Sequence, residues 1–112
     1  MAENLVSTVR KDMKDYKITV LLVDDQAFVG ETVRRMLEDD EVKNMLGGKQ
    51  LDFHFCQDPS TALKTAEAIN PTVILQDLVM PDIPGMTLVK FYRAHSALKD
   101  VPVIVLSSKE EA

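Results

Sequence analysis

The sequence predicts an α/β fold with a doubly wound parallel sheet. Four apolar runs typical of strands alternate with segments typical of helices. This β-α-β-α-β-α-β order favours parallel strands joined by right-handed crossovers. Two of the runs, residues 18–23 and 73–76, end directly in carboxylates, which are Asp24, Asp25 and Asp77. Ligands bind to open α/β sheets at the carboxyl ends of the strands, so we expect a site where these side chains meet.

Composition and charge narrow the possible functions. The chain has 112 residues, of which 46% are hydrophobic and 28% charged, as expected for one folded domain. Its net charge of −5 offers no basic surface for a nucleic-acid backbone, so we expect no direct nucleic-acid partner. No apolar run reaches the length of a membrane span and no signal peptide is recognisable, which predicts a cytoplasmic protein without membrane contact. The single Cys56 is expected to be a buried, unreactive thiol.

The first half of the chain predicts an added helix before the first βαβ unit. Residues 4–16 place apolar side chains at helical spacing, so we expect residues 1–17 to form an amphipathic extension and residues 18–112 the main domain. That stripe predicts either local packing or a homodimer contact. A helix should begin near Ala27, continue through the acidic residues 38–41, and end at Gly47 and Gly48. Residues 51–56 alternate as a half-buried strand near a sheet edge.

The second half repeats the alternation. Asp58 and Pro59 predict a capped helix that ends at Asn70 and Pro71. Residues 73–76 form the third predicted strand, and a loop with Pro81 and Pro84 leads to a helix whose inward side chains include Leu88, Val89 and Tyr92. Residues 101–106 form the fourth predicted strand.

Three motifs together resemble the response-regulator receiver domain of two-component signalling. They are Leu-Leu-Val-Asp24-Asp25, Leu-Gln-Asp77-Leu-Val-Met-Pro81 followed by Gly85, and Pro102-Val-Ile-Val-Leu-Ser107-Ser108. The resemblance implies the flavodoxin-like strand order 2-1-3-4-5, of which this chain holds four βα units. The stretches 53–59 and 71–81 are most similar to receivers that precede diguanylate cyclase (GGDEF) domains.

The resemblance implies a role for each motif residue. Asp77 is the expected phosphoacceptor and Ser107 the expected switch hydroxyl. Mg²⁺ or Mn²⁺ is expected on Asp25 and Asp77, on Asp24 through water, and on the backbone carbonyl of Val79. Three crowded carboxylates should also raise at least one pKa when no metal is bound. The implied partners are a histidine kinase and an output domain or target protein, possibly a diguanylate cyclase domain.

Other interpretations of the same residues stay open at this stage. The family pattern continues with a lysine after a fifth strand, and the chain ends at Ala112, so we expect a receiver truncated after strand four with an exposed apolar edge at residues 103–106. A non-phosphorylated pseudo-receiver or dimerisation module is the first alternative function. A phosphohydrolase of the haloacid dehalogenase type is the second, although that family has a second Asp where Val79 stands. Asp24 and Asp25 could also cap the following helix, and Ser107 could be an ordinary loop residue.

Overall fold

The apolar runs form four strands of one parallel sheet. A computed structural model describes residues 17–107. Its strands are β1 (Lys17–Val23), β2 (Gln50–Cys56), β3 (Val73–Asp77) and β4 (Val103–Leu106). They lie in the order β2-β1-β3-β4, and every neighbouring pair is parallel. The predicted fold class is confirmed, and the order follows the flavodoxin-like pattern.

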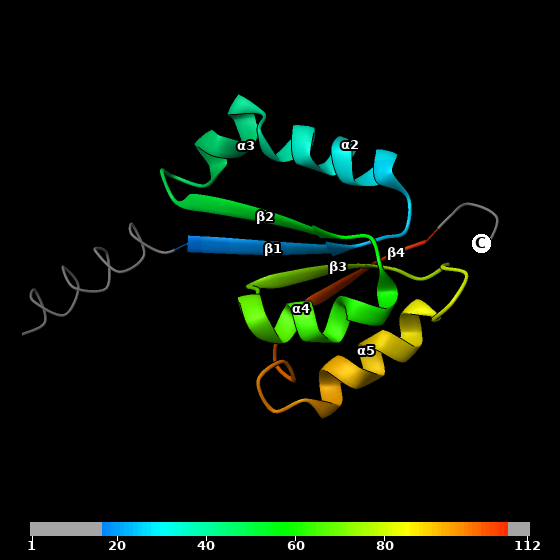
Figure 1. The fold of residues 1–112 in the computed structure, drawn as a ribbon. Helices are drawn as coiled ribbons and strands as arrows, with labels where there is room; N and C mark the ends of the chain where they lie inside the picture. Colours follow the sequence, from blue (N-terminus) through cyan, green and yellow to red (C-terminus); the bar gives the residue numbers. More distant parts are fainter. Residues whose placement is uncertain (1–16, 108–112) are drawn as a thin grey trace, which may run out of the picture.

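Helices cover both faces of this sheet, as Figure 1 shows. They are α2 (Ala27–Leu37), α3 (Asp40–Met45), α4 (Ala62–Ile69) and α5 (Gly85–Ala94), with a 3₁₀ turn, η1 (Pro59–Thr61), directly before α4. In Figure 1, α2 and α3 lie on one face, and α4 and α5 lie on the other. Because all neighbouring strands are parallel, the carboxyl ends of the four strands lie at the same edge of the sheet.

One predicted helix is in fact two. We expected a continuous helix from Ala27 to the two glycines, but α2 stops at Leu37 and α3 starts at Asp40. Between them Asp39 has an extended backbone, and its side-chain Oδ1 accepts a hydrogen bond of 2.8 Å from the backbone N–H of Glu41. Short acidic side chains compete with the helix by binding their own backbone in this way, so Asp39 acts as a cap and ends the continuity.

Other predicted boundaries shift by a few residues. Asp58 does cap its helix, with Oδ1 accepting the N–H of Ser60 at 3.0 Å, but the first turn is the 3₁₀ turn η1. Asn70 ends α4 in the left-handed conformation, with φ of 51°. Strand β4 begins at Val103, two residues later than predicted, because Val101 and Pro102 complete the preceding turn. The predicted helix over residues 4–16 lies outside the described residues.

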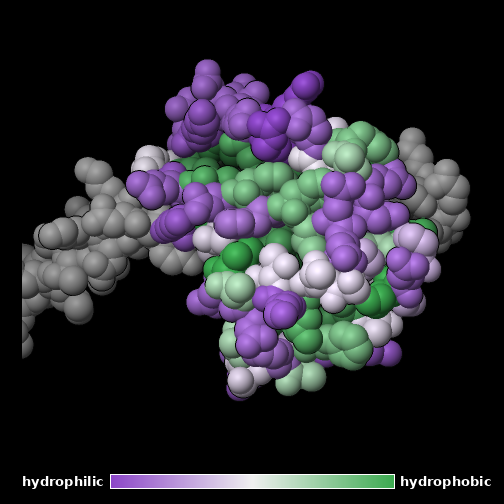
Figure 2. Space-filling view, in the orientation of Figure 1, coloured by the Kyte–Doolittle hydropathy of each residue, from purple (hydrophilic) through white to green (hydrophobic). Residues whose placement is uncertain are grey.

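The main core lies between the sheet and the α4–α5 layer. Its buried members include Leu21, Ile74, Leu88, Tyr92 and Leu98. Full burial of one leucine side chain stabilises a fold by about 2 kcal/mol, so this cluster is the principal source of stability. In Figure 2 hydrophobic residues appear in the band between the two helix layers, and hydrophilic residues cover the top of the α2–α3 layer.

The two outer strands of the described sheet differ. Strand β2 is half buried at one edge, as predicted, and Cys56 at its end is buried with 7% exposure. Strand β4 lies at the opposite edge of the described sheet, where Ile104 and Val105 are 54% and 47% exposed. Within residues 17–107, no helix has the length and apolar character needed to cross a membrane.

Gly85 lets α5 rest directly on the end of β3. A methyl group at this position would lie 2.0 Å from the carbonyl oxygen of Asp77 and 2.6 Å from the Cα of Leu78. We expect Gly85→Ala to lower the free energy of unfolding by about 3 kcal/mol, because backbone atoms cannot yield as a side chain can. Chemical denaturation measures this change. The control is Gly48→Asn, at a glycine with positive φ and open space around it, which should cost less than about 1 kcal/mol. Equal effects of the two substitutions would contradict the close packing.

Candidate functional site

Three carboxylates meet at the carboxyl ends of β1 and β3. Asp24 and Asp25 directly follow β1, and Asp77 is the last residue of β3. One oxygen from each lies within 4.8 Å of the others. The two strands are adjacent and parallel, with Val23 opposite Gln76, so the topology brings these side chains together as predicted.

Asp24 and Asp25 have different surroundings. Asp24 is 5% exposed, and its Oδ1 accepts a hydrogen bond of 2.9 Å from the backbone N–H of Gln26 at the start of α2. This bond reaches the N-cap residue Gln26 and not an N–H inside α2, so Asp24 does not cap the helix as the alternative interpretation required. Asp25 makes no such bond: its Oδ1 is buried and has no hydrogen-bond partner. A buried carboxylate oxygen without a partner is unfavourable, so Asp25 is the acid of this cluster that would gain most from a ligand.

The electrostatics of the cluster also favour a cation. Burial raises the pKa of Asp24 above its usual value, and the negative charges of Asp77 and Asp25 raise it further, against the lowering effect of the Gln26 N–H. Burial likewise raises the pKa of Asp77, and the charge of Asp25 adds to it. The prediction that at least one carboxyl pKa rises is confirmed for Asp24 and Asp77, with burial as the larger cause and the neighbouring negative charges as the smaller one.

A pocket of about 470 Å³ opens above the carboxylates. Asp24 and Asp77 line it together with Ser107, which directly follows β4 and is exposed. Val79, also in its wall, donates its backbone N–H to Oδ1 of Asp77 at 3.2 Å. The structure thus brings Asp24, Asp25, Asp77, Val79 and Ser107 to one end of the sheet, as expected, while Ser108 lies outside the described residues.

The donor set fits a hard divalent cation. Mg²⁺ and Mn²⁺ prefer oxygen ligands, chiefly carboxylates and carbonyls, with water completing the shell. Asp25 supplies the unpartnered oxygen, Asp77 a second carboxylate, and Asp24 retains one oxygen that is not used by Gln26. A cation bound here would favour the ionised carboxylates and so oppose the effects of burial and of like charge that raise the pKa of Asp24 and Asp77.

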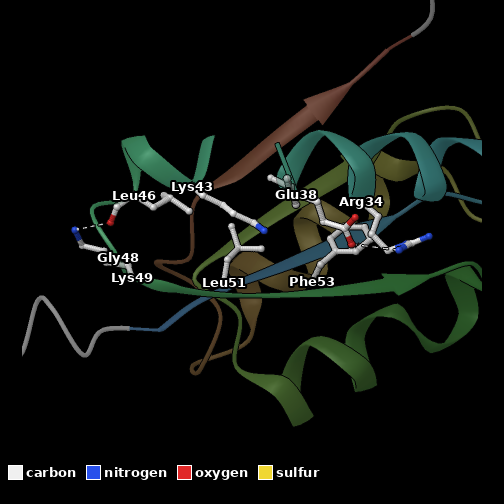
Figure 3. Close-up of a pocket in the computed structure, with 9 residues that line it drawn as sticks. Arg34, Glu38, Lys43, Leu46, Gly48, Lys49, Leu51 and Phe53 are labelled. Atoms are coloured by element: carbon white, nitrogen blue, oxygen red, sulfur yellow. Dashed lines mark hydrogen bonds and ion pairs between the residues drawn. The ribbon is translucent and has the colours of Figure 1, made fainter. Parts of the chain in front are cut away.

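A second, larger pocket lies between the α2–α3 segment and strand β2 (Figure 3). It has a volume of about 590 Å³. Its lining is Arg34, Leu37, Glu38, Lys43, Leu46, Gly48, Lys49, Leu51 and Phe53. Its one carboxylate, Glu38, is paired with Arg34 at 3.3 Å, and the ammonium of Lys49 donates to the carbonyl of Leu46. This pocket is the larger of the two, but its lining has no cluster of acids. The smaller pocket beside Asp24 and Asp77 is therefore the better candidate for the functional site.

Some neighbours of the site were not predicted from the sequence. The side-chain Nε2 of Gln57 donates to the backbone carbonyl of Asp25 at 3.3 Å, and Phe28 forms part of the pocket wall while 67% exposed. Neither residue belongs to a spacing pattern in the sequence. Gln57 lies in the loop after β2 and Phe28 in the first turn of α2, both beside the strand ends. That position is the only signal that could have indicated a role.

Comparison with known proteins identifies the family. The family model of the response regulator receiver domain matches residues 20–112. The chain belongs to this family. The resemblance seen in the three motifs is therefore confirmed, and the receiver is a phosphoacceptor module of two-component signalling.

Three relatives illustrate the match. A protein-glutamate methylesterase/protein-glutamine glutaminase of Rhodospirillum rubrum is 36% identical over 85% of this chain, and the match spans 23% of that relative's length. The crystal structure of chemotaxis protein CheY4 of Vibrio cholerae shares 27% identity, with a TM-score of 0.65 over 86% of this chain and 75% of that one. The Mn²⁺-bound response regulator Rcp1 shares the fold, with a TM-score of 0.66 at 22% identity over 84% of this chain and 70% of that one.

The receiver therefore spans about a quarter of the length of its curated relative. Receivers of this family interact with histidine kinases and with output domains, and the named relative bears the name of an enzyme. In this chain the described residues include one acidic cluster that could hold a metal ion, made of Asp24, Asp25 and Asp77.

Proposed function

We propose that Asp77 is the phosphoacceptor of this receiver and that Asp24, Asp25 and Asp77, with the backbone carbonyl of Val79, hold Mg²⁺ or Mn²⁺. The observation that supports this most strongly is the unpartnered, buried Oδ1 of Asp25 beside two acids whose pKa values are raised. A cation ligand satisfies that oxygen and relieves the repulsion at once.

The proposed reaction is a transfer from phosphohistidine to carboxylate. An oxygen of Asp77 attacks the phosphorus, the P–N bond breaks, and its electron pair returns to the imidazole, leaving an acyl phosphate on Asp77. The cation, when bound, neutralises charge on the phosphoryl oxygens. The N–H of Val79 donates to Oδ1 of Asp77, which orients the other oxygen toward the open pocket.

Ser107 is the proposed switch residue. It follows β4 in the register that pairs Asp77 with Leu106, so its hydroxyl lies one residue beyond the level of the phosphoacceptor. A hydroxyl at this place is a suitable donor to a phosphoryl oxygen on Asp77, and the loop that bears it would be drawn toward the site.

The alternatives explain less of this geometry. A pseudo-receiver or dimerisation module has no need of an unpartnered buried carboxylate oxygen. A dehalogenase-type phosphohydrolase would need an acid two residues after Asp77, where the exposed Val79 stands.

For the output, the methylesterase relative favours an attached or partner enzyme of that type over the diguanylate cyclase suggested by the sequence resemblance. Four other statements stay predictions. They are a histidine kinase as phosphodonor, a cytoplasmic location, the division into an extension (1–17) and a receiver (18–112), and a homodimer contact.

Mapping the phosphate tests the proposal. Acetyl phosphate with Mg²⁺ should label the intact protein on Asp77, and mass spectrometry of peptides should find the phosphate there alone. Omission of Mg²⁺ should remove the label. Phosphate found on Asp82, on Ser107 or on a histidine would contradict the assignment.

A further inference from the structure

Gln76, the residue before the phosphoacceptor, is a polar side chain buried in the hydrophobic core. It is 0% exposed and lies on the face of β3 that packs against α5, beside the equally buried Ile74 and Tyr92. An apolar residue would fill the same space without needing partners, and a buried amide is favourable only when hydrogen-bonded. Its bonds therefore indicate what it does.

Gln76 bridges the phosphoacceptor backbone and α5. Its Nε2 donates to the carbonyl oxygen of Asp77 at 2.9 Å, and its Oε1 accepts from the hydroxyl of Tyr92 at 2.7 Å. A carbonyl can only accept, which fixes the orientation of the amide and makes Tyr92 the donor. Burial raises the pKa of Tyr92, so this hydroxyl keeps its proton.

This bridge acts where β3 keeps only one of its two neighbouring strands, since Asp77 still pairs with Leu106 of β4. The pairing of β1 with β3 ends at Gln76, one residue before Asp77. Gly85, the first residue of α5, lies against the same Asp77 carbonyl and donates its N–H to the carbonyl of Leu78 at 3.2 Å. Helix α5 thus contacts the end of β3 through its first residue and, two turns later, through Tyr92.

We propose that Gln76 and Tyr92 form a positioning pair that holds the peptide after Asp77 in the orientation needed for phosphoryl transfer; this inference rests on the proposed role of Asp77. Rotation of that peptide would move both the Asp77 side chain and the N–H of Val79 that binds it. Attack on phosphorus requires the reacting atoms at a close and aligned distance, so small displacements reduce the rate more than they reduce donor binding.

Phosphorylation kinetics of the intact protein test the pair. With acetyl phosphate and saturating Mg²⁺, Gln76→Leu should lower the maximal rate constant about tenfold and leave the half-saturating concentration of acetyl phosphate within about twofold. Tyr92→Phe, which removes one oxygen and keeps the ring, should lower the rate constant about threefold. The double variant should be no slower than Gln76→Leu, because both substitutions break one unit.

A matched control separates positioning from loss of stability. Leu98→Ala empties a fully buried site in the same core, at a residue outside the Gln76–Tyr92–Asp77 hydrogen bonds, and all rates are measured well below each variant's Tm. The positioning role requires Leu98→Ala to keep the wild-type rate constant. Wild-type rate constants in Gln76→Leu and Tyr92→Phe, or an equal loss in Leu98→Ala, would overturn it.

If Gln76→Leu fails to fold, Tyr92→Phe alone tests the positioning role: a lowered rate constant supports the role, and a wild-type rate constant contradicts it. Absence of label on wild-type Asp77 would instead reject the proposed function.

Discussion

Asp77→Asn is expected to abolish phosphorylation, with a loss of at least about 10³-fold in rate. An amide has the shape of the carboxylate but is a far weaker nucleophile, so the pocket remains while the acceptor is lost. The amide oxygen can still accept the N–H of Val79, as Oδ1 of Asp77 does at 3.2 Å. Quantitative mass spectrometry after incubation with acetyl phosphate and Mg²⁺ measures the effect.

The control for this variant is Asp82→Asn, an exposed acid five residues further along, which should phosphorylate normally. Asp77→Asn should also remain folded, and in metal-free buffer at pH 7 its Tm should exceed that of wild type. Because burial raises the pKa of Asp77 in the folded protein, ionisation costs stability as pH rises through that pKa, and a neutral amide avoids the cost. The gain should shrink at pH 4. Persistent labelling of the folded variant would show that the acceptor is another residue.

Asp25→Asn is expected to weaken binding of Mg²⁺ or Mn²⁺ by at least about 30-fold, and Asp24→Asn by less than about tenfold. Asp25 contributes a buried oxygen with no other partner, whereas one oxygen of Asp24 is already engaged by the N–H of Gln26. The chain has no tryptophan, so titration calorimetry or the spin-resonance signal of Mn²⁺ is the suitable measurement.

The control here is Asp100→Asn, an exposed acid before β4 and so at the opposite end of the strands, which should leave the affinity unchanged. Affinity should also fall as pH is lowered toward the raised pKa values of Asp24 and Asp77, because only ionised carboxylates are ligands. Equal affinity of wild type and Asp25→Asn would remove Asp25 from the site.

The site could be predicted from the sequence because parallel topology leaves little freedom. Once residues 18–23 and 73–76 are recognised as buried parallel strands, their carboxyl ends must lie at one edge. The strand order implied by the family resemblance makes the two strands neighbours, so the acids that follow were expected to meet. The ranking of Asp25 above Asp24 as a metal ligand was also expected from the family resemblance. The hydrogen bond from Gln26 and the unpartnered Oδ1 of Asp25 now supply its physical reason.

The helix break was not predicted, because Val42, Met45 and Leu46 again lie at helical spacing soon after Leu37, while the backbone turns between the two segments. Asp39 adopts a capping conformation in place of a helical one through a single hydrogen bond, a difference of about 1 kcal/mol that depends on the packing of both segments. Local preferences of that size are easily reversed by tertiary contacts.

The sequence by itself determined the fold class, the parallel direction of the strands and the placing of Asp24, Asp25 and Asp77 at one edge of the sheet, since these follow from hydrophobic periodicity and chain direction. Only the tertiary structure decided the role of Gln76. In the sequence it is a polar interruption of a strand. In the fold it faces Tyr92, which lies 16 residues further along the chain, and the carbonyl of the neighbouring Asp77. Partners at that separation are selected by how α5 packs on the sheet, which no local pattern specifies.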